Sequence, residues 1–341
     1  MSLTKDFRFP AEWELHRATW LSYPYLEDSF PGRLEKVWPV FAQFVAVLSE
    51  GEAVCINVPD AEQARKARAE FRIAGADLSK ITFFAHPTDD VWCRDHGGIF
   101  LKNNTGDQII LDWAFTAWGG KYAHAQDAQI AQKMALARGL PTLSPGIVME
   151  GGAIENNGAG TLLTTEGCLL HPNRNPELSK DQIESYLKTY FNAQQVLWLG
   201  EGIVGDDTDG HIDDLTRFVA VDTVLTVLET DPQDINYDPL QENFNRLKSF
   251  KLPDGRPLNI HTLPMPDPVC DSEGNRLPAS YANFYIANHA VIVPTFACPQ
   301  DAEALAIIGR HFRHRRVVGL DSRDIVAGFG SFHCLSQQEP L

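Results

Sequence analysis

The order of strand-like and helical segments along the 341-residue chain predicts an α/β fold. Short apolar runs rich in Val, Ile, Leu and aromatic residues recur throughout, and single helical patterns fall between many of them. No composition break or long polar linker divides the chain, so we expect a single domain over residues 1–341. The strand-like runs are residues 53–58, 81–86, 108–113, 195–200, 217–229, 289–296 and 315–320.

Each helix is predicted by its own local signal. Apolar residues at three- and four-residue spacing indicate the first helix, which Pro39 is expected to kink or to delay. Two further segments are rich in Ala, Gln, Lys and Arg, which are good helix formers. Ser179 and Gln182 make a capping box. Leu178 and Ile183 can form its hydrophobic staple, so a helix is expected to begin at residue 180. The predicted helices cover residues 34–48, 61–71, 124–138, a segment from 180 onward, and 298–312.

Turn and loop signals lie between these elements. The stretch ENNGAG at 155–160 predicts a hairpin turn, with Asn157 and Gly158 suited to positive φ. Residues 251–280 contain six prolines and predict a long loop. Alternating strands and helices ordinarily indicate a doubly wound parallel sheet. The glycine-rich phosphate loops that often accompany that fold, GxGxxG and GxxxxGK[ST], are missing from the sequence.

The composition limits the classes of partner. The formal net charge is −16, so we expect no nucleic-acid partner, which would require a basic face. The same charge attracts small cations weakly, although simple solubility explains it equally well. No apolar run approaches the roughly 20 residues of a membrane span, and residues 1–15 lack the apolar core of a secretory signal. The six cysteines show no CxxC spacing, which favours free thiols in a reducing cytoplasm.

Four glycine-flanked stretches gather the reactive side chains. Glycine beside polar groups lets the backbone approach a ligand closely, although ordinary turns are built in the same way. One stretch, GDDTDGHIDDL at 205–215, holds five aspartates and one histidine. In an extended chain its alternate residues would point the same way, which suits either a pair of divalent metal ions or a cationic substrate. The four stretches are residues 92–98, 149–154, 205–214 and 328–338.

The metal interpretation meets local objections. An EF-hand loop with Gly210 at its sixth position would have Gly205 first and Thr216 twelfth, where acids are needed. A binuclear manganese site would need a second ligand cluster, and the other stretches offer only scattered acids. We therefore predict no metal and no cofactor. A zinc site could draw on four residues, no two of which have finger spacing: Cys93, His96, His211 and Cys334.

Several residues have both a structural and a chemical interpretation. A lone cysteine is usually a small buried hydrophobe, but Cys334 follows two glycines in a polar stretch, where a nucleophile is a second interpretation. His211, if not structural, would be held protonated by its neighbouring aspartates, and could then stabilise a thiolate or protonate a leaving amine. Trp92 could stack on a planar cation or pack in the core. The candidate carboxylates, which could equally serve turns or caps, are Asp95, Glu150 and Asp213.

Nearly the whole chain resembles the agmatine deiminase family, which also contains the bacterial Porphyromonas-type peptidylarginine deiminases. The resemblance runs through FPAEWELHRATWLSYP at 9–24, MEGGAIENNGAGTLLTTEGCLLHPNRNP at 149–176 and HCLSQQEP at 333–340. Further matched segments are residues 113–122, 206–214 and 280–296. The resemblance implies a five-bladed α/β propeller, the pentein fold, in which small mixed sheets, each with a helix, surround a central acidic channel.

The resemblance also implies a role for each candidate. Cys334 matches the nucleophile, and His211 matches the general acid/base. Glu150 matches the acid that orients His211 and contacts the substrate, while Asp95 and Asp213 match two carboxylates that hold the guanidinium nitrogens. Such a pair would fix the guanidinium plane over the sulfur. The residues implied to bind the rest of the substrate are Trp92, Trp118 and Asp209.

These matches lead us to expect a metal-free cytoplasmic hydrolase that converts agmatine to N-carbamoylputrescine and ammonia through a covalent cysteine intermediate. Its partner would be a small cationic guanidinium compound, and a homodimer is one assembly that the sequence allows. Two departures from the family pattern, at 96–98 and 331–332, leave the choice between agmatine, arginine and peptidyl-arginine open. The rival interpretations are a peptidyl-arginine deiminase, a metal-dependent ureohydrolase and a non-catalytic polyamine-binding protein.

Overall fold

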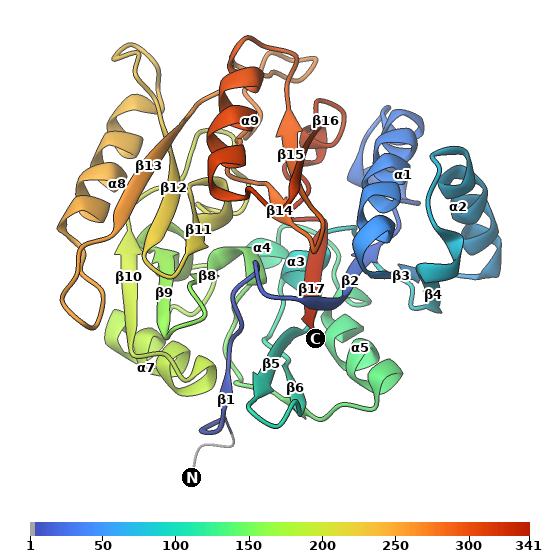
Figure 1. The fold of residues 1–341 in the computed structure, drawn as a ribbon, viewed down its shortest axis with the longest axis horizontal. Helices are drawn as coiled ribbons and strands as arrows, with labels where there is room; N and C mark the ends of the chain where they lie inside the picture. Colours follow the sequence, from blue (N-terminus) through green and yellow to red (C-terminus); the bar gives the residue numbers. More distant parts are fainter. Residues whose placement is uncertain (1–3) are drawn as a thin grey trace.

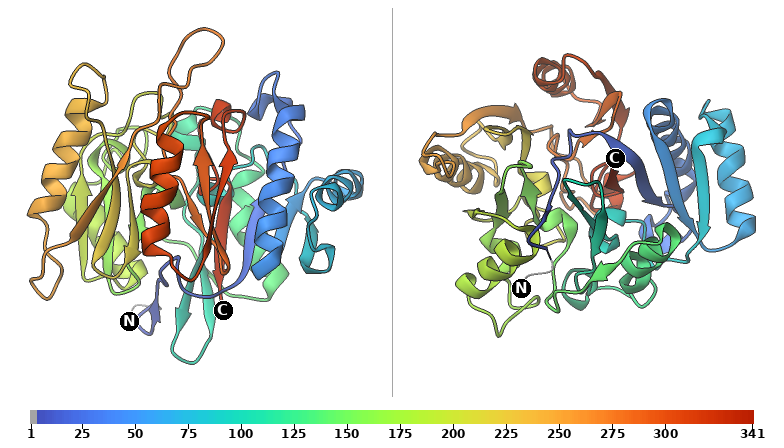
Figure 2. Two further views of the ribbon diagram at one scale, coloured as in Figure 1. Left: turned by 45° about the horizontal axis from the view of Figure 1, so that its top comes forward. Right: turned by 60° about the horizontal axis from the view of Figure 1, so that its bottom comes forward.

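The computed structural model describes residues 4–341 as small mixed β-sheets with helices packed against them (Figure 1). The long helices lie at the periphery and the strands lie toward the middle, as the right-hand view of Figure 2 shows. Within the described residues the strands form five separate sheets. The predicted α/β class is confirmed. The single doubly wound parallel sheet that the alternation ordinarily indicates is wrong, because no sheet has more than four of the described strands.

Four sheets repeat one pattern. Two strands adjacent in the chain pair antiparallel, and the chain then returns through a helix to a third strand parallel to the second. A helix suits this connection because parallel neighbours cannot be joined by a tight turn. In the first, β1 (Phe7–Arg8) also pairs with β5. The sheets are β5 (Ile99–Asn103), β6 (Gln108–Leu111) and β7 (Thr142–Leu143) with α5 (Ile130–Arg138); β8 (Glu155–Asn156), β9 (Thr161–Thr165) and β10 (Gln195–Leu199) with α7 (Lys180–Phe191); β11 (Thr216–Ala220), β12 (Thr223–Leu228) and β13 (Asn259–Pro264) with α8 (Tyr237–Ser249); and β14 (Tyr285–Ile286), β15 (Ala290–Thr295) and β16 (Arg316–Asp321) with α9 (Gln300–His311).

The fifth sheet joins segments that are far apart in the chain. Its late strand pairs antiparallel with an early strand, which is followed by two parallel neighbours. Figure 1 shows this late strand, near the label C, beside the early one. The strand order is β17 (Ser336–Pro340), β2 (His16–Ser22), β3 (Ala53–Val58) and β4 (Ile81–Ala85), with α1 (Leu34–Gly51) and α2 (Ala61–Ile73) in the connections.

Short helical turns occupy several of the remaining connections, and three of them carry site candidates. They are α3 (Cys93–His96), α4 (Ala117–Gly120), α6 (Glu166–Leu169), η1 (Glu27–Ser29), η2 (Leu78–Lys80), η3 (Asp127–Gln129), η4 (Gly151–Ala153), η5 (Ile212–Asp214) and η6 (Val326–Gly328). None of the helices in the described part of the chain is long and apolar enough to cross a membrane.

Helix α1 shows how local sequence and packing agree. Val37, Phe41 and Phe44 recur at three- and four-residue spacing, and all three are fully buried in one apolar cluster. Burial of each such side chain stabilises the fold by roughly 1.5–3 kcal/mol. Pro39 does not delay the helix, which begins at Leu34. The reason is its place near the start, where few N–H groups have helical partners to lose.

Two local predictions are confirmed in detail. The capping box of Ser179 and Gln182 is present, and α7 begins at the expected residue 180. The stretch 155–160 connects the antiparallel strands β8 and β9 as a hairpin. Positive φ falls on Gly158 and Gly160 rather than on Asn157, since glycine adopts that conformation without strain.

Other local predictions are wrong. The run 217–229 is two strands, β11 and β12, rather than one. Helix α5 begins only at Ile130, and the preceding residues include the turn η3. The predicted loop 251–280 contains β13, which pairs in parallel with β12. Helix α8 was not predicted at all.

Candidate active site

The fold brings the four glycine-flanked stretches together. Short turns follow strands or precede them, and α3 contacts both η4 and β17, while η4 contacts η5. These turns carry Asp95, Glu150, His211 and Asp213, and Cys334 lies just before β17. All five side chains are buried, with at most 5% of their surface exposed. The five residues predicted to do chemistry therefore lie at one place.

Glycines make this close approach possible. A Cβ atom on Gly152 would lie 2.6 Å from His211 Nδ1 and 2.8 Å from Asp95 Oδ1. A Cβ atom on Gly330 would lie 2.6 Å from the Trp92 ring and 3.0 Å from Cys334 Cβ. Both distances are far inside van der Waals contact, so the glycine signal in the sequence reflects the packing of the site itself.

Cys334 is surrounded by negative charge. Its Sγ lies 3.4 Å from Asp213 Oδ2 and 3.0 Å from Asn283 Nδ2. Burial raises the pKa of the Cys334 thiol well above its usual value, and the Asp213, Asp214 and Asp95 carboxylates raise it further. The resting cysteine is therefore a protonated thiol.

His211 lies between two carboxylates. Its Nδ1 is 3.7 Å from Asp95 Oδ1, and its Nε2 is 3.8 Å from Glu150 Oε2. Burial alone would lower the pKa of His211, but the Asp95 charge and contacts with Cys168 and Glu150 outweigh it and raise the pKa well above the usual value. The imidazole is thus protonated at neutral pH, as the sequence predicted.

The source of that charge differs from the prediction. The stretch 205–214 is not extended, because Asp209 and Gly210 have positive φ and η5 follows directly. Its acids therefore do not all point toward His211. Asp206 accepts hydrogen bonds from backbone N–H groups within its own loop, and Asp207 pairs with Tyr122 and Lys121. The expected alignment of alternate side chains is wrong for this loop.

The carboxylates differ in how their oxygens are used. Asp95 accepts hydrogen bonds from Gly152 N at 2.9 Å and from Trp118 Nε1 at 3.0 Å. Glu150 Oε1 accepts from Arg174 Nε at 2.7 Å, and Asp213 Oδ2 accepts from His333 Nδ1 at 2.7 Å. Among the described residues, Glu150 Oε2, Asp213 Oδ1 and both ring nitrogens of His211 have no hydrogen-bond partner. Buried polar atoms without partners are rare, so these atoms mark where a ligand binds.

A cavity of about 840 Å³ opens onto the sulfur. Trp92, Asp95, Trp118 and Cys334 lie in its wall, which confirms that both predicted tryptophans face it. Trp118 and Ala117 adopt left-handed φ of 54° and 49°, a strained conformation for residues with side chains. The outer wall is strongly acidic and includes Asp28, Asp89, Asp90, Asp207, Asp271 and Glu273.

Asp209 does not line this cavity in the described structure. Its carboxylate accepts hydrogen bonds from Arg174 at 2.7 Å, from Asn173 at 3.0 Å and from Lys121 at 3.0 Å. These hydrogen bonds lower the pKa of Asp209 to about 2, although burial acts in the opposite direction. Its contact with a substrate stays a prediction.

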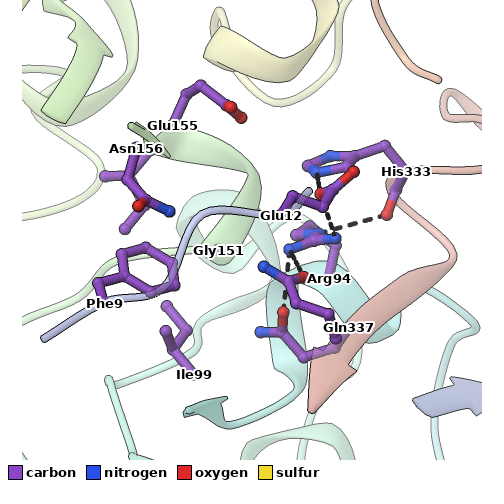
Figure 3. A pocket seen from close by; sticks show the side chains of 11 residues that line it. Phe9, Glu12, Arg94, Ile99, Gly151, Glu155, Asn156, His333 and Gln337 are labelled. Carbon is purple, nitrogen blue, oxygen red and sulfur yellow. Dashed lines mark hydrogen bonds and ion pairs between the residues drawn. The ribbon is translucent and has the colours of Figure 1, made fainter. Parts of the chain in front are cut away.

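Three residues at this site were missed by the sequence reasoning: Asn283, Arg174 and Glu12. Behind the sulfur, Glu12 Oε2 lies 2.8 Å from His333 Nε2, and Figure 3 shows Glu12, Arg94 and His333 side by side around a void of about 10 Å³. All three missed residues lie in segments matched to the family. Their signal was a polar residue inside an otherwise apolar or turn-rich segment, which alone does not name a partner.

One group of donor atoms among the described residues could hold a metal ion: Glu150, Cys168 and His211, whose atoms lie within 4.8 Å of one another. The surroundings oppose it. Arg174 places a positive charge 2.7 Å from Glu150, and the pKa values of His211 and Cys168 are both raised, so two ligands would first have to lose protons. The zinc set considered from sequence is not assembled, since His96 pairs instead with Ser22 and Asp127.

The fold and the site define a class of α/β protein with a buried cysteine, a protonated histidine and carboxylates around one acidic cavity. A family model described as Porphyromonas-type peptidyl-arginine deiminase matches residues 8–340, and the chain belongs to that family. It is 36% identical to the agmatine deiminase of Ectopseudomonas mendocina over 98% of this chain and 95% of the relative.

Solved structures agree with this assignment. The agmatine deiminase of Enterococcus faecalis has a TM-score of 0.92 at 32% identity, covering 100% of this chain and 98% of that one. A cysteine-to-serine variant of C. jejuni agmatine deiminase with substrate bound has a TM-score of 0.88 at 32% identity, covering 98% and 96%.

Proposed function

We propose that this protein is an agmatine deiminase, which hydrolyses the guanidinium group of agmatine to give N-carbamoylputrescine and ammonia. The observation that carries the proposal is a buried thiol beside carboxylates with unpartnered oxygens, at the end of an acidic cavity. Agmatine deiminases among the relatives support the choice of substrate.

The unpartnered oxygens suit a guanidinium. Asp213 Oδ1 and Glu150 Oε2 can accept its N–H groups, and Asp95 would exchange its bond from Trp118 for one from the substrate. The acidic outer wall favours a second positive charge at the far end of the molecule, as the amine of agmatine provides. Free arginine would bring a carboxylate to the same wall, which disfavours it.

The chemistry follows from the charges. Arrival of the substrate cation offsets the negative charges that hold the pKa of Cys334 high, so the thiol ionises when the substrate is bound. The thiolate adds to the guanidinium carbon, and His211 protonates the departing nitrogen, which leaves as ammonia. The product of this step is a cationic amidino thioether on Cys334.

Neutral His211 then takes a proton from water, whose oxygen adds to the same carbon. The C–S bond breaks, which releases the ureido product and restores the thiolate. One further proton leaves with ammonia as ammonium. In this scheme Asp209 acts at one remove, because it holds Arg174, which in turn holds Glu150.

We also propose that the five sheets are the blades of a closed propeller in one domain. The shared strand pattern of four sheets supports this arrangement, and so does the pairing of β17 with β2, which joins late and early parts of the chain. A cytoplasmic location stays a prediction.

One assay tests the activity. Purified protein is incubated with agmatine and EDTA, and ammonia, urea and N-carbamoylputrescine are measured. We expect ammonia and N-carbamoylputrescine in equal amounts and no effect of the chelator. Urea, or activity that EDTA abolishes, would instead indicate a metal-dependent ureohydrolase. Parallel reactions with arginine and an arginyl peptide decide between agmatine and the peptide substrate that the family description names.

A further inference from the structure

Asn283 contacts the sulfur of Cys334 directly. It lies in the segment before β14 and has only 1% of its surface exposed. One N–H of its side chain points at Cys334 Sγ, 3.0 Å from Nδ2, and the other donates to Asp214 Oδ1 at 3.0 Å. No feature of the sequence marked this residue.

The carbonyl end of the same amide holds the backbone of the nucleophile. Asn283 Oδ1 accepts from the N–H of His333 at 3.1 Å and from the N–H of Cys334 at 3.3 Å. These two donors fix the orientation of the amide, because a flipped side chain would set its NH₂ group against two N–H groups. The donor end must therefore face the sulfur.

This donor is unusual among the groups around the sulfur. Asp213 Oδ2 lies 3.4 Å away and is an acceptor, and the other nearby charges on Cys334 are also carboxylates. An N–H directed at sulfur stabilises a thiolate more than a thiol, because hydrogen bonds to charged atoms are the stronger ones. Asn283 is thus placed to favour the reactive form in an otherwise hostile field.

We propose that Asn283 is a further catalytic residue, which stabilises the Cys334 thiolate through its side-chain N–H and holds the nucleophile segment through its carbonyl. The proposal rests on the function proposed above for its kinetic part. The same N–H acts twice: it supports the attacking thiolate, and it receives the thiolate again when the C–S bond breaks.

Two variants separate the two ends of the amide. Asn283→Asp keeps an acceptor for the backbone N–H groups of His333 and Cys334 but removes the donor to sulfur and adds charge. Asn283→Ala removes both ends. The matched control is Asn288→Ala, because Asn288 bridges the backbone of His16 in the same region without touching the sulfur.

The first measurement is the rate at which iodoacetamide alkylates Cys334 as a function of pH, in the absence of substrate. We expect the midpoint to move to higher pH in both Asn283 variants, by about one pH unit or more, and further in Asn283→Asp. The control should keep the wild-type midpoint. Cys334→Ala identifies the background from the other cysteines, and thermal unfolding identifies any variant that is not folded.

The second measurement is the kinetics on agmatine. We expect kcat to fall roughly 10- to 100-fold in Asn283→Asp, the loss of a hydrogen bond to a charged group, with KM little changed. An unchanged alkylation midpoint in a folded Asn283→Asp protein would overturn the proposal, as would a rise in KM alone. The alkylation result stands even if agmatine is not the substrate, so failure of the proposed function and failure of this inference are distinguishable.

Discussion

Two groups of buried charge lie on either side of Asp213 and differ in how they are satisfied. On the cavity side, Glu150, Asp213 and His211 keep atoms without partners. On the far side, each oxygen of Glu12 faces donors: Oε1 lies 2.8 Å from Ile286 N and 3.0 Å from Arg217, and Oε2 lies 2.8 Å from His333. The first group needs a ligand to complete it, whereas the second is completed by the chain.

The far group, which we call the hub, is electrically balanced. His333 has a carboxylate oxygen within 2.8 Å of each ring nitrogen, and both carboxylates can only accept, so the ring carries both protons. With Arg94 and Arg217 it supplies three positive charges against the carboxylates of Glu12, Glu155 and Asp213. The comparison teaches that similar residues serve stability in one place and chemistry in the other.

The largest effect is expected on the cavity side. Cys334→Ala should lower turnover of agmatine by roughly 10⁴-fold or more, because the covalent route is lost. Its thermal unfolding should stay close to that of the wild type, since no polar network is broken there. Ammonia release is the measurement, and Cys270→Ala, at an exposed cysteine, is the matched control. Substantial remaining turnover would contradict the covalent route.

Breaking the hub should act on stability instead. Arg217 is fully buried and pairs with Glu155 at 2.8 Å and with Glu12 at 3.0 Å. Arg217→Met should lower the free energy of unfolding by about 3–5 kcal/mol, because two carboxylates lose their counter-charge. Urea unfolding measures it. The exposed Arg256→Met should change stability by no more than about 1 kcal/mol, and equal losses in both would remove the distinction.

A charge on the cavity side can be removed with the opposite pattern. Burial and the neighbouring Asp213 and Glu150 raise the pKa of Asp95, so its ionised form opposes folding at neutral pH. Asp95→Asn should lower kcat/KM on agmatine by about 10²–10³-fold while the free energy of unfolding falls by no more than about 1 kcal/mol. A large loss of stability would place Asp95 with the hub.

The smallest effect is a slope against pH. Burial would raise the pKa of Glu12, but Arg217 and His333 outweigh it and hold the pKa well below its usual value. A lowered carboxyl pKa gives stability that is present above about pH 4.5 and is lost as the pH falls toward the folded-state pKa. Glu12→Gln should therefore unfold with a shallower acid slope, by up to about 1.4 kcal/mol per pH unit. Unfolding followed from pH 5 downward measures it, and an unchanged slope would contradict the lowered pKa.

Local patterns predicted elements well where the signal was local. The capping box placed the start of α7, and the apolar spacing placed α1. Strand β13 was missed because its pairing with β12 is decided by tertiary contact, while its own prolines indicate a loop. The five-sheet arrangement leaves no clear sequence repeat, because each unit needs only the same pattern of burial and not the same residues.

The site divides in the same way. Reactive residues beside glycines, such as Cys334 and His211, could be found from the sequence and the family resemblance. Asn283 could not, since its role depends on a contact with a residue 51 positions away. The cluster at 205–215 was misread geometrically for a related reason: one left-handed residue, Asp209, turns the chain and sends its acids in different directions.

The pairing of β17 with β2 has a consequence for how the protein becomes active during its synthesis. Trp20 of β2 donates a hydrogen bond to Glu339 of β17, 319 residues later in the chain. Cys334 immediately precedes β17, so its thiol cannot reach the carboxylates until this long-range pairing forms. Contacts of such separation form late because the loop they close is entropically costly. A ribosome-bound chain can therefore build its substrate pocket before it holds a working nucleophile, and catalysis begins only when the last strand docks.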